Sequence, residues 1–368
     1  MKLIFSANSF IYIYKLRFDI IKKLKNLNYE IIVVAGEDRF KNIIQNLGFE
    51  THSIGIQPNK KNIFSDLYLA LQYLYIYSKI KPDIVFHSTI KPNIYGSIAT
   101  RILGIRTINN ISGLGTVFFK KNFIQRLVIF LYKISQKKVD TMLFQNDDDL
   151  NFFLEKSICK KNQTKRIPGS GVNLNKFNRS KFHANEQKNR FEFLYIGRLV
   201  REKGILEYIE SAQSLSDKYD NIDFKIIGDF DEKNKSSIKE NELNSLIKNY
   251  KNIQHLPYQD KIQNFIVNTN CIVLPSWREG LSNILLESCS LETPAITSNV
   301  TGCNDVIIDE VNGFLCKHKN STDLAIKMEK FYLLSREEQI ILGKKGREIV
   351  EKKFSIEKVF EDYISILS

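Results

Sequence analysis

The sequence predicts an α/β protein made of two doubly wound domains. Its 368 residues are too many for one ordinary domain and suit two, and a hydrophobic share of 43% can fill two cores. Apolar runs of strand length alternate with helical patterns in both halves, as is typical of parallel sheets. A polar, aperiodic stretch separates the two series. We therefore expect an N-terminal domain at 1–175, a linker at 176–190, a C-terminal domain at 191–354 and a closing segment at 355–368.

The first half contains seven runs with strand character. In a doubly wound parallel sheet, ligands bind at the carboxyl ends of the strands, so the residues after each run are the candidates for a site. We expect strands at 2–7, 30–35, 49–54, 83–87, 107–111, 141–144 and near 165–167, and helices at about 15–27, 38–47, 63–80, 93–103, 121–138 and 146–156.

The second half repeats the alternation. Two similar domains joined by a linker are expected to face each other across a cleft. The final helix, at about 356–367, is a candidate to cross back to the first domain. We expect strands at 191–196, 223–227, 253–256, 271–274, 295–297 and 314–316, and a helix at 281–291.

The formal net charge of +13 is placed unevenly along the chain. Residues 1–185 hold 29 Lys and Arg against 12 Asp and Glu, whereas residues 186–368 hold 25 against 29. The first half is thus expected to meet something anionic: phospholipid, pyrophosphate or nucleic acid. Lysine-rich codon usage is the alternative, although it does not explain the asymmetry. No nucleic-acid recognition motif is present, so we expect no nucleic-acid partner.

Targeting and cysteine signals are weak. The five cysteines are odd in number and lack C-x-x-C or Cys/His metal spacing, which favours a reducing cytoplasm. The first strand is too short and too soon interrupted for a signal peptide, and no apolar window has the length of a membrane span. The expectation is a soluble or peripheral protein.

A basic loop, Gly197 to Gly204, follows one predicted strand and precedes a helix. Arg198 and Lys203 in this loop can hold a diphosphate, the arginine through a forked pair of hydrogen bonds and the lysine as a compact charge. An ordinary basic surface turn is an equally good interpretation of this loop alone. Neither a P-loop nor a G-x-G-x-x-G fingerprint is present.

Two glutamates, Glu279 and Glu287, lie eight residues apart in a segment that begins at Pro275. One is expected in the turn before a helix and the other about two turns along it, so both can face the carboxyl end of the preceding strand. The turn also supplies N–H groups at a helix N-terminus, which suit phosphate or sugar hydroxyls. Taken alone, such a pair is more often a loop glutamate and a solvated helix glutamate.

The order of these motifs resembles a known family. The Gly197–Gly204 loop, the Ile226-Ile227-Gly228-Asp229 strand end and the E-x7-E segment follow Ile167-Pro168-Gly169-Ser170-Gly171-Val172-Asn173. Together they resemble the retaining, nucleotide-sugar-dependent glycosyltransferases of GT-B fold, the "glycosyltransferases group 1", which include bacterial polysaccharide and lipid-linked-oligosaccharide enzymes.

The resemblance implies roles for the residues of a donor site. Arg198 and Lys203 would bind the donor diphosphate and stabilise the leaving nucleoside diphosphate. Glu287 would accept hydrogen bonds from the ribose. Glu279 and the 280–283 turn would hold the donor sugar, which makes Glu279, Arg198 and Lys203 the catalytic candidates. The remaining donor-binding candidates are Gly280, Leu281, Ser282, Asn283, Gly228, Pro257 and Tyr258.

The first half is expected to bind the acceptor. Asn8 and Ser9 stand where relatives often have a glycine-rich loop, and Ser112-Gly113 stands where many read His-Gly, so a catalytic histidine there is excluded. Histidines that end a strand are more often structural than functional. The helices near 64–80 and 122–133 carry basic and aromatic residues, but packing on the sheet is favoured over a lipid anchor for both. The other acceptor-side candidates are Arg17, His87 and Lys91.

The expected reaction is transfer of a hexose or N-acetylhexosamine from a UDP-sugar to a glycan acceptor, with retention and with neither metal nor cofactor. Asp147-Asp148-Asp149 opens a predicted helix and is interpreted as charge at its N-terminus, not as a metal motif. The basic first half suggests a polyprenyl-diphosphate-linked acceptor and peripheral contact with an anionic membrane at its cytoplasmic face. A nucleotide-sugar epimerase and a non-catalytic nucleotide-sugar-binding protein are the alternatives.

Overall fold

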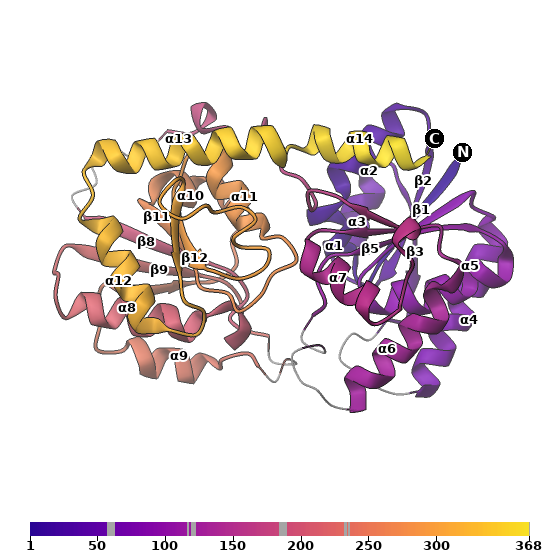
Figure 1. Ribbon diagram of the computed structural model, residues 1–368, viewed down its shortest axis with the longest axis horizontal. Helices are drawn as coiled ribbons and strands as arrows, with labels where there is room; N and C mark the ends of the chain where they lie inside the picture. Colours follow the sequence, from indigo (N-terminus) through magenta and orange to yellow (C-terminus); the bar gives the residue numbers. More distant parts are fainter. Residues whose placement is uncertain are drawn as a thin grey trace. The chain divides into compact units, whose positions relative to one another are not determined.

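The structure is a computed structural model that describes residues 1–56, 63–115, 118, 123–183, 190–231, 234 and 236–367 (Figure 1). Residues 184–189 of the predicted linker, and 121–122 of a predicted helix, lie outside the described residues. The chain forms two compact units. The first unit contains residues 1–170 and 356–368, and the second contains residues 171–355.

The first unit is built on a seven-stranded parallel sheet in the order β3-β2-β1-β4-β5-β6-β7. Its order reverses between β1 and β4, which defines the switch point of a doubly wound fold. The strands are β1 Lys2–Ala7, β2 Glu30–Gly36, β3 Glu50–Ile54, β4 Ile84–Ser88, β5 Arg106–Ile111, β6 Thr141–Phe144 and β7 Thr164–Arg166.

Helices cover both faces of this sheet because successive side chains of each strand point to opposite sides. Leu3 and Phe5 pack on one face with α1, α2, α3 and α14, whereas Ile4 and Val85 pack on the other with α4 and α5 (Figure 1). The helical elements are α1 Phe10–Leu16, α2 Phe18–Asn26, α3 Phe40–Asn46, α4 Ile63–Ile80, the π-helix η1 Pro92–Gly96, α5 Ser97–Leu103, α6 Phe123–Ser135, α7 Asp147–Glu155 and α14 Ile356–Leu367.

The C-terminal helix α14 belongs to the first unit. Tyr363 is buried, and its ring stacks at 5.4 Å from Phe86 and 6.5 Å from Phe5. The Arg106 guanidinium donates to the Ile366 carbonyl at 2.5 Å. The last helix therefore completes the core beside β1 and β4, in a sheet whose strands all precede it by 190 residues or more.

The second unit has a six-stranded parallel sheet in the order β10-β9-β8-β11-β12-β13, with its switch point between β8 and β11. The contacts of α8 with α12, and of α11 with α13, define its two helical layers (Figure 1). Its strands are β8 Phe191–Ile196, β9 Ile222–Ile227, β10 Ile253–Leu256, β11 Cys271–Leu274, β12 Ala295–Ser298 and β13 Gly313–Cys316; its helices are α8 Ile205–Ser216, α9 Glu240–Ile247, α10 Gln263–Asn268, α11 Asn283–Ser290, α12 Ser321–Tyr332 and α13 Arg336–Lys353.

The described part of the predicted linker, residues 176–183, packs on the second unit. Phe177 is buried in that unit's core, and its carbonyl accepts from the Arg347 guanidinium at 2.9 Å. The Arg179 guanidinium donates to the Leu291 carbonyl at 3.1 Å. The polar composition of this stretch obscured its apolar anchors, since Phe182, partly buried, packs against the same core as Phe177. The units divide at 170/171 and 355/356, whereas the expected boundaries were 175/176 and 354/355.

No helix in the described ranges combines the length and the apolarity that spanning a bilayer requires.

Candidate active site

The loops after β8 and β11 meet at the switch point of the second sheet. The Gly197 N–H donates to the Ile227 carbonyl at 3.0 Å, which fixes the start of the β8 loop against β9. The Trp277 N–H donates to the Glu202 carbonyl at 2.9 Å, which joins the β8 loop to the β11 loop. The two motifs singled out in the sequence, 71 or more residues apart, therefore form one surface at the carboxyl ends of the strands.

Two glycines allow these loops to approach each other closely. Gly204 has φ +72°, and a Cβ atom there would overlap the Pro275 carbonyl. Gly302, in the loop after β12, has φ +78°, and a Cβ atom would lie 2.6 Å from the Glu279 carbonyl oxygen. Both positions need the left-handed region and an absent side chain, which only glycine supplies without strain.

Lys203 and Glu279 form an ion pair with each other. Their side chains are 22% and 11% exposed, and the Ser276 hydroxyl donates to the same Glu279 oxygen at 2.8 Å. The sequence placed these two residues on different parts of a ligand; the structure brings them together. Ser276 was missed, although its place directly after Pro275 at a strand end was a usable signal.

Arg198 is the second residue of the loop after β8, and its side chain is exposed. Its guanidinium forms no ion pair with any residue in the described part of the chain. The buried Tyr195 hydroxyl donates to the Arg198 carbonyl at 3.0 Å and so holds the backbone. Burial, with the negative charge of Glu279 as a further cause, raises the pKa of Tyr195, which keeps its hydroxyl protonated as that donor.

The turn after Glu279 is held by the loop that follows β12. The Glu279 N–H donates to the Thr301 carbonyl, and the Ser282 N–H donates to the Gly302 carbonyl, both at 3.0 Å. The Ser282 N–H is therefore engaged within the protein, and the role of Ser282 in donor binding stays a prediction. Leu281 is buried in the core, so its side chain also faces away from a ligand, while Gly280 is half-buried at the bend.

Helix α11 begins at Asn283, two residues later than predicted, with Ser282 as its N-cap. Its first turn contains no acidic residue, so the partial positive charge of the helix end is not neutralised within that turn. Glu287 lies about one turn along the helix, not two, and is half-buried. Asn283 therefore lies at the N-terminal end of α11, four residues after Glu279, and Glu287 lies near the middle of the helix.

The ends of β9 and β10 close one side of the site. The Gly228 carbonyl hydrogen-bonds to His255 Nε2 at 2.8 Å, and the Tyr258 N–H donates to Asp229 Oδ1 at 2.8 Å. Pro257 is exposed and Tyr258 is half-buried. No local pattern indicated that His255 and Asp229 shape this edge, because both contacts join residues 27 or more apart.

In the first unit, four predicted or neighbouring polar residues form a separate cluster. The Tyr12 hydroxyl donates to Ser112 Oγ at 2.8 Å, and Arg17 donates to Tyr12 at 3.2 Å and to Ser170 at 2.7 Å. Arg17 is only 2% exposed, its Nε has no hydrogen-bond partner, and it forms no carboxylate pair within the described ranges. We call Tyr12, Arg17, Ser112 and Ser170 the Arg17 cluster.

Asn8 and Ser9 follow β1 at the same sheet edge. The Asn8 N–H donates to the Thr89 hydroxyl at 3.1 Å, and the Asn8 Oδ1 atom is buried with no hydrogen-bond partner in the described part of the chain. Ser9 is the N-cap of α1, and its side chain makes no cap hydrogen bond. Gly113, at φ +120°, follows Ser112 and lets the chain turn there.

His87 is a structural residue, which corrects its placement at the acceptor site. It is fully buried, with Nε2 at 3.0 Å from the Tyr77 hydroxyl and Nδ1 at 2.9 Å from Asn109 Oδ1. A Cβ atom on Gly96 would overlap its ring. Burial lowers the pKa of His87 to about 4, so the ring is neutral near pH 7.

Lys91 is also paired within the fold. Its ammonium lies 2.9 Å from Asp66 Oδ1, and the Tyr95 hydroxyl donates to Asp66 Oδ2 at 2.9 Å. Its side chain is 14% exposed. This network ties η1 to α4, and the acceptor contact of Lys91 stays a prediction.

Comparisons with known proteins agree with this geometry. Residues 176–349 match the sequence profile of the family described as Glycosyl transferases group 1, and residues 2–146 match that described as Glycosyl transferase 4-like. The chain belongs to the group 1 glycosyltransferases.

Named relatives span nearly the whole chain of this glycosyltransferase. The capsular polysaccharide biosynthesis glycosyltransferase CapM of Staphylococcus aureus is 28% identical, over 94% of this chain and 91% of CapM. The N,N'-diacetylbacillosaminyl-diphospho-undecaprenol alpha-1,3-N-acetylgalactosaminyltransferase of Campylobacter jejuni is 27% identical, over 93% and 92%. The structure of Anabaena HepE in complex with UDP and glucose superposes with a TM-score of 0.82 at 16% identity, over 100% and 99% of the two chains. The fold is thus GT-B, as expected.

The glycosyltransferase site offers two kinds of positive charge to an anion. Arg198 is exposed and has no carboxylate partner among the described residues, whereas Lys203 is already paired with Glu279. A diphosphate at this place would compete with Glu279 for Lys203. Within the described ranges no three His, Cys, Asp or Glu side chains are grouped as a metal site. Asp147, Asp148 and Asp149 lie in the first turn of α7 behind the N-cap Asn146, as predicted.

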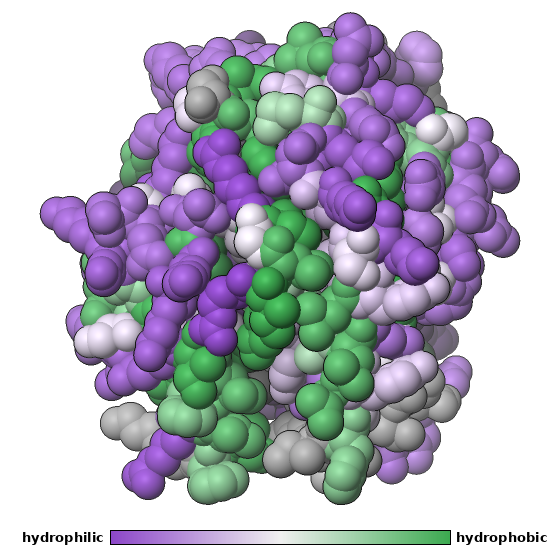
Figure 2. Space-filling view, turned by 90° about the vertical axis from the view of Figure 1, so that its right-hand side faces the viewer, coloured by the Kyte–Doolittle hydropathy of each residue, from purple (hydrophilic) through white to green (hydrophobic). Residues whose placement is uncertain are grey.

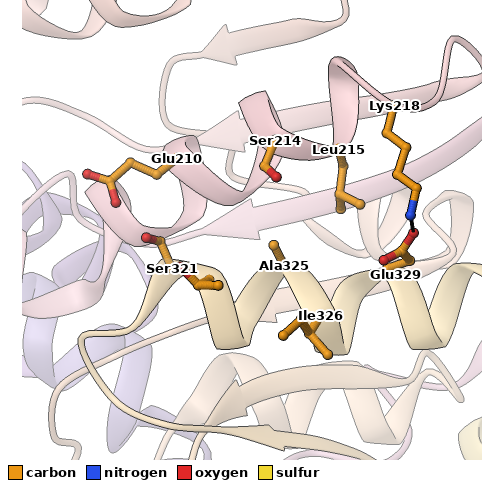
Figure 3. A pocket seen from close by; sticks show the side chains of 9 residues that line it. Glu210, Ser214, Leu215, Lys218, Ser321, Ala325, Ile326 and Glu329 are labelled. Carbon is orange, nitrogen blue, oxygen red and sulfur yellow. Dashed lines mark hydrogen bonds and ion pairs between the residues drawn. The ribbon is translucent and has the colours of Figure 1, made fainter.

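A surface groove elsewhere in the glycosyltransferase lies between α8 and α12 (Figure 3). Its volume is about 280 Å³, and the Lys218–Glu329 ion pair stands at one end. Leu215, Ala325 and Ile326 supply its apolar wall. None of its lining residues comes from the loops after β8 or β11, so it is not part of the site described above.

Proposed function

We propose that this glycosyltransferase transfers a hexose or N-acetylhexosamine from a UDP-sugar to a glycan acceptor on polyprenyl diphosphate, with retention at the anomeric carbon and without a metal ion. The proposal places it in the synthesis of a surface polysaccharide or glycoconjugate at the cytoplasmic face of the cell membrane. The observation that carries it is the Lys203–Glu279 pair, set beside the exposed Arg198 at the sheet's switch point.

The donor diphosphate is assigned to Arg198 and Lys203. A guanidinium and an ammonium can together neutralise the charge that develops on the leaving diphosphate, which is the electrostatic work that a divalent cation performs in other enzymes. When the diphosphate takes Lys203 as its partner, the Glu279 carboxylate becomes available to the hydroxyls of the donor sugar. Glu287, one turn along α11, is assigned to the ribose.

The reaction needs no protein nucleophile. The bond between the anomeric carbon and the diphosphate oxygen breaks, and the acceptor hydroxyl oxygen bonds to the same face of that carbon. The acceptor proton passes to an oxygen of the departing UDP. Glu279 positions the sugar and stabilises positive charge at the anomeric carbon, and Arg198 and Lys203 hold the leaving group.

The acceptor is assigned to the first unit. The Arg17 cluster contains a buried guanidinium with no carboxylate, and the half-buried Tyr12 and Ser112 hydroxyls beside it can hydrogen-bond to a phosphate or sugar. The lipid diphosphate in the acceptor of the Campylobacter jejuni relative supports this class of substrate. The UDP complex of Anabaena HepE supports the donor nucleotide.

The test is product formation from a panel of UDP- and GDP-sugars, in EDTA, with a bacterial lipid extract as acceptor. We expect release of UDP and formation of a glycosylated lipid from one UDP-hexose or UDP-N-acetylhexosamine. Epimerised nucleotide sugar formed without any acceptor would assign an epimerase instead. Binding of nucleotide sugar without turnover in the complete mixture would refute catalysis, and full dependence on added Mg²⁺ would refute the metal-free reaction.

A further inference from the structure

The outer sides of α4 and α6 carry large apolar side chains that are largely exposed. On α4 these are Phe64, Leu67, Tyr68, Leu71 and Tyr75, which are 54–79% exposed. On α6 they are Phe123, Leu127 and Phe130, which are 39–77% exposed. We call these eight side chains the outer apolar face. The sequence favoured packing on the sheet for both helices. Such packing explains the apolar residues on the sides of α4 and α6 that face the sheet, but not those on the outer sides.

The spacing shows that each helix has two distinct sides. Positions 64, 67, 68, 71 and 75 recur at intervals of one, three and four residues, so they share one side of α4. Leu69, Tyr73 and Tyr77, on the opposite side, are fully buried against the sheet. The exposed side of α4 is therefore not a frayed or misplaced part of the core, because the helix is anchored by its other side.

The two helices present these sides in one layer. Both α4 and α6 contact η1, and α4 also contacts α5. Helices α4, α5 and α6 therefore cover the same face of the sheet. Ile102 on α5 is 62% exposed in that layer. Figure 2 views the side of the molecule on which the first unit lies, and apolar residues gather in the lower half of that view, over the region of α4 and α6.

The outer apolar face is large for a monomer. If each side chain contributes roughly 200 Å² when fully accessible, the eight expose on the order of 900 Å², whereas the largest patch on a typical soluble monomer is about 300–600 Å². Five of the eight are aromatic, and aromatic side chains are enriched where protein meets the bilayer interface. The face is thus of a size and kind that a partner surface normally covers.

Positive charge surrounds this face, and negative charge is absent from it. Residues 67–80 and 123–135 contain no Asp or Glu, while Arg126 and Lys133 are exposed on α6 and Lys79 is exposed at the end of α4. Asp66 is paired with Lys91. The first unit as a whole holds 27 Lys and Arg against 15 Asp and Glu, whereas the second holds 27 against 26. A second copy of the same face would bring like charges together, whereas an anionic lipid surface would neutralise them.

We propose that the outer apolar face of α4 and α6 inserts into the interface of an anionic bilayer, with Lys79, Arg126 and Lys133 at the level of the lipid headgroups. Amphipathic helices with Phe, Leu and Tyr on one side and basic residues at its edge bind bilayers in this way. The inference deepens the proposed function, because it assigns the surface by which the enzyme reaches a lipid-linked acceptor. Bilayer binding itself requires neither donor nor acceptor, so it can be tested separately.

The experiment is co-flotation of the full chain with vesicles of phosphatidylcholine alone or with 30% phosphatidylglycerol. We expect the wild-type protein to float with the anionic vesicles and to dissociate as salt is raised. Leu67→Gln/Leu71→Gln and Phe123→Gln/Phe130→Gln should each weaken the partition coefficient by about tenfold or more, because two large apolar side chains leave the bilayer. The matched control is Ile340→Gln/Ile341→Gln on α13, whose side chains are 46% and 57% exposed in the second unit.

Three results would overturn the proposal: wild-type protein that does not float, a control variant that weakens flotation as much as the other two, or a lipid-free wild-type dimer that the α4 or α6 substitutions convert to monomer. The last result would assign the face to self-association. A UDP-induced rise in melting temperature, measured for every variant, shows that each remains folded. The same measurement separates the bilayer-binding hypothesis from the proposed donor site. If UDP does not raise the melting temperature of the wild-type protein, the donor site is contradicted, whereas the flotation result still stands.

Discussion

The Lys203–Glu279 ion pair leads to opposite predictions for its two members. Two unit charges at 4 Å attract by about 4 kcal/mol at an effective dielectric constant of 20, and desolvation leaves a net of about 1–2 kcal/mol for a half-buried pair. In the unliganded enzyme Glu279 is paired with Lys203 and therefore competes with a diphosphate for the Lys203 ammonium. Removing the lysine and removing the carboxylate should change UDP affinity in different directions.

Lys203→Ala removes one charge-assisted hydrogen bond to the diphosphate, which is worth about 1.5–3 kcal/mol, so UDP should bind about 10- to 150-fold more weakly. Glu279→Gln removes the competitor for Lys203, so UDP affinity should stay the same or increase by up to about tenfold. The same substitution should lower kcat by about 100-fold, because the carboxylate is lost from the donor sugar. Calorimetric titration with UDP and initial rates of UDP release give the two quantities.

The control for this pair is Lys345→Ala, which breaks an ion pair with Glu348 whose side chains are both 50% exposed on α13. Exposed pairs contribute little, so neither UDP affinity nor kcat should change measurably. If Glu279→Gln weakened UDP binding as much as Lys203→Ala does, the carboxylate would be supporting the nucleotide site itself. The competition between Glu279 and the diphosphate would then be refuted.

Three further predictions concern the fold and the acceptor side. Gly302→Ala should lower the free energy of unfolding by about 2–3 kcal/mol in denaturant unfolding, because it adds a clash with Glu279 to the cost of φ +78°. The control Gly104→Ala, at φ +69° with open space around it, should cost only about 1 kcal/mol. Equal losses would contradict the clash. The folded state lowers the pKa of His87 to about 4 from an ordinary 6.5, so the unfolded chain binds more protons between these pH values. The free energy of unfolding should therefore fall by up to about 3 kcal/mol as the pH drops from 6.5 to 4. In His87→Gln the free energy of unfolding should depend less steeply on pH over this range. Arg17→Met should lower transfer to the lipid acceptor at least about tenfold while UDP affinity stays unchanged; an equal loss of UDP binding would remove Arg17 from the acceptor side.

The strands were the most predictable part of the fold. The runs at 2–7, 141–144, 191–196 and 271–274 have the observed bounds, because predominantly apolar segments of this length are buried on both faces of a parallel sheet. The run at 253–256 also has the observed bounds, although in the edge strand β10 only Ile253 is buried. The region at 10–27 was less readable. A single helix from about 15 was expected, whereas α1 begins at Phe10 and the chain breaks at Arg17, whose backbone leaves helical geometry at φ −130°, ψ −10°.

The candidate site could be predicted as a set of residues but not as an arrangement. Arg198, Lys203, Glu279 and Glu287 each follow a strand or begin a helix, and that is visible along the chain. The pairing of Lys203 with Glu279 depends on β8 and β11 being neighbours, and strand order is a property of the sheet that no local pattern encodes. For the same reason His87, at the end of β4, could not be separated from an exposed strand-end histidine until Tyr77 and Asn109 closed around it.

Helix α4 shows a different limit of sequence patterns. Its apolar residues occupy nearly every side, and a helix that is apolar all round is ordinarily buried, so packing was the better interpretation. The structure buries only the side with Leu69, Tyr73 and Tyr77, since the sheet of the first unit offers α4 a single surface. The spacing of apolar residues shows how many sides of a helix are apolar, but it does not show how many of those sides are buried within the same domain. The second apolar side of α4 thus requires a partner outside the chain, and the basic residues along α6 make an anionic bilayer the partner that fits.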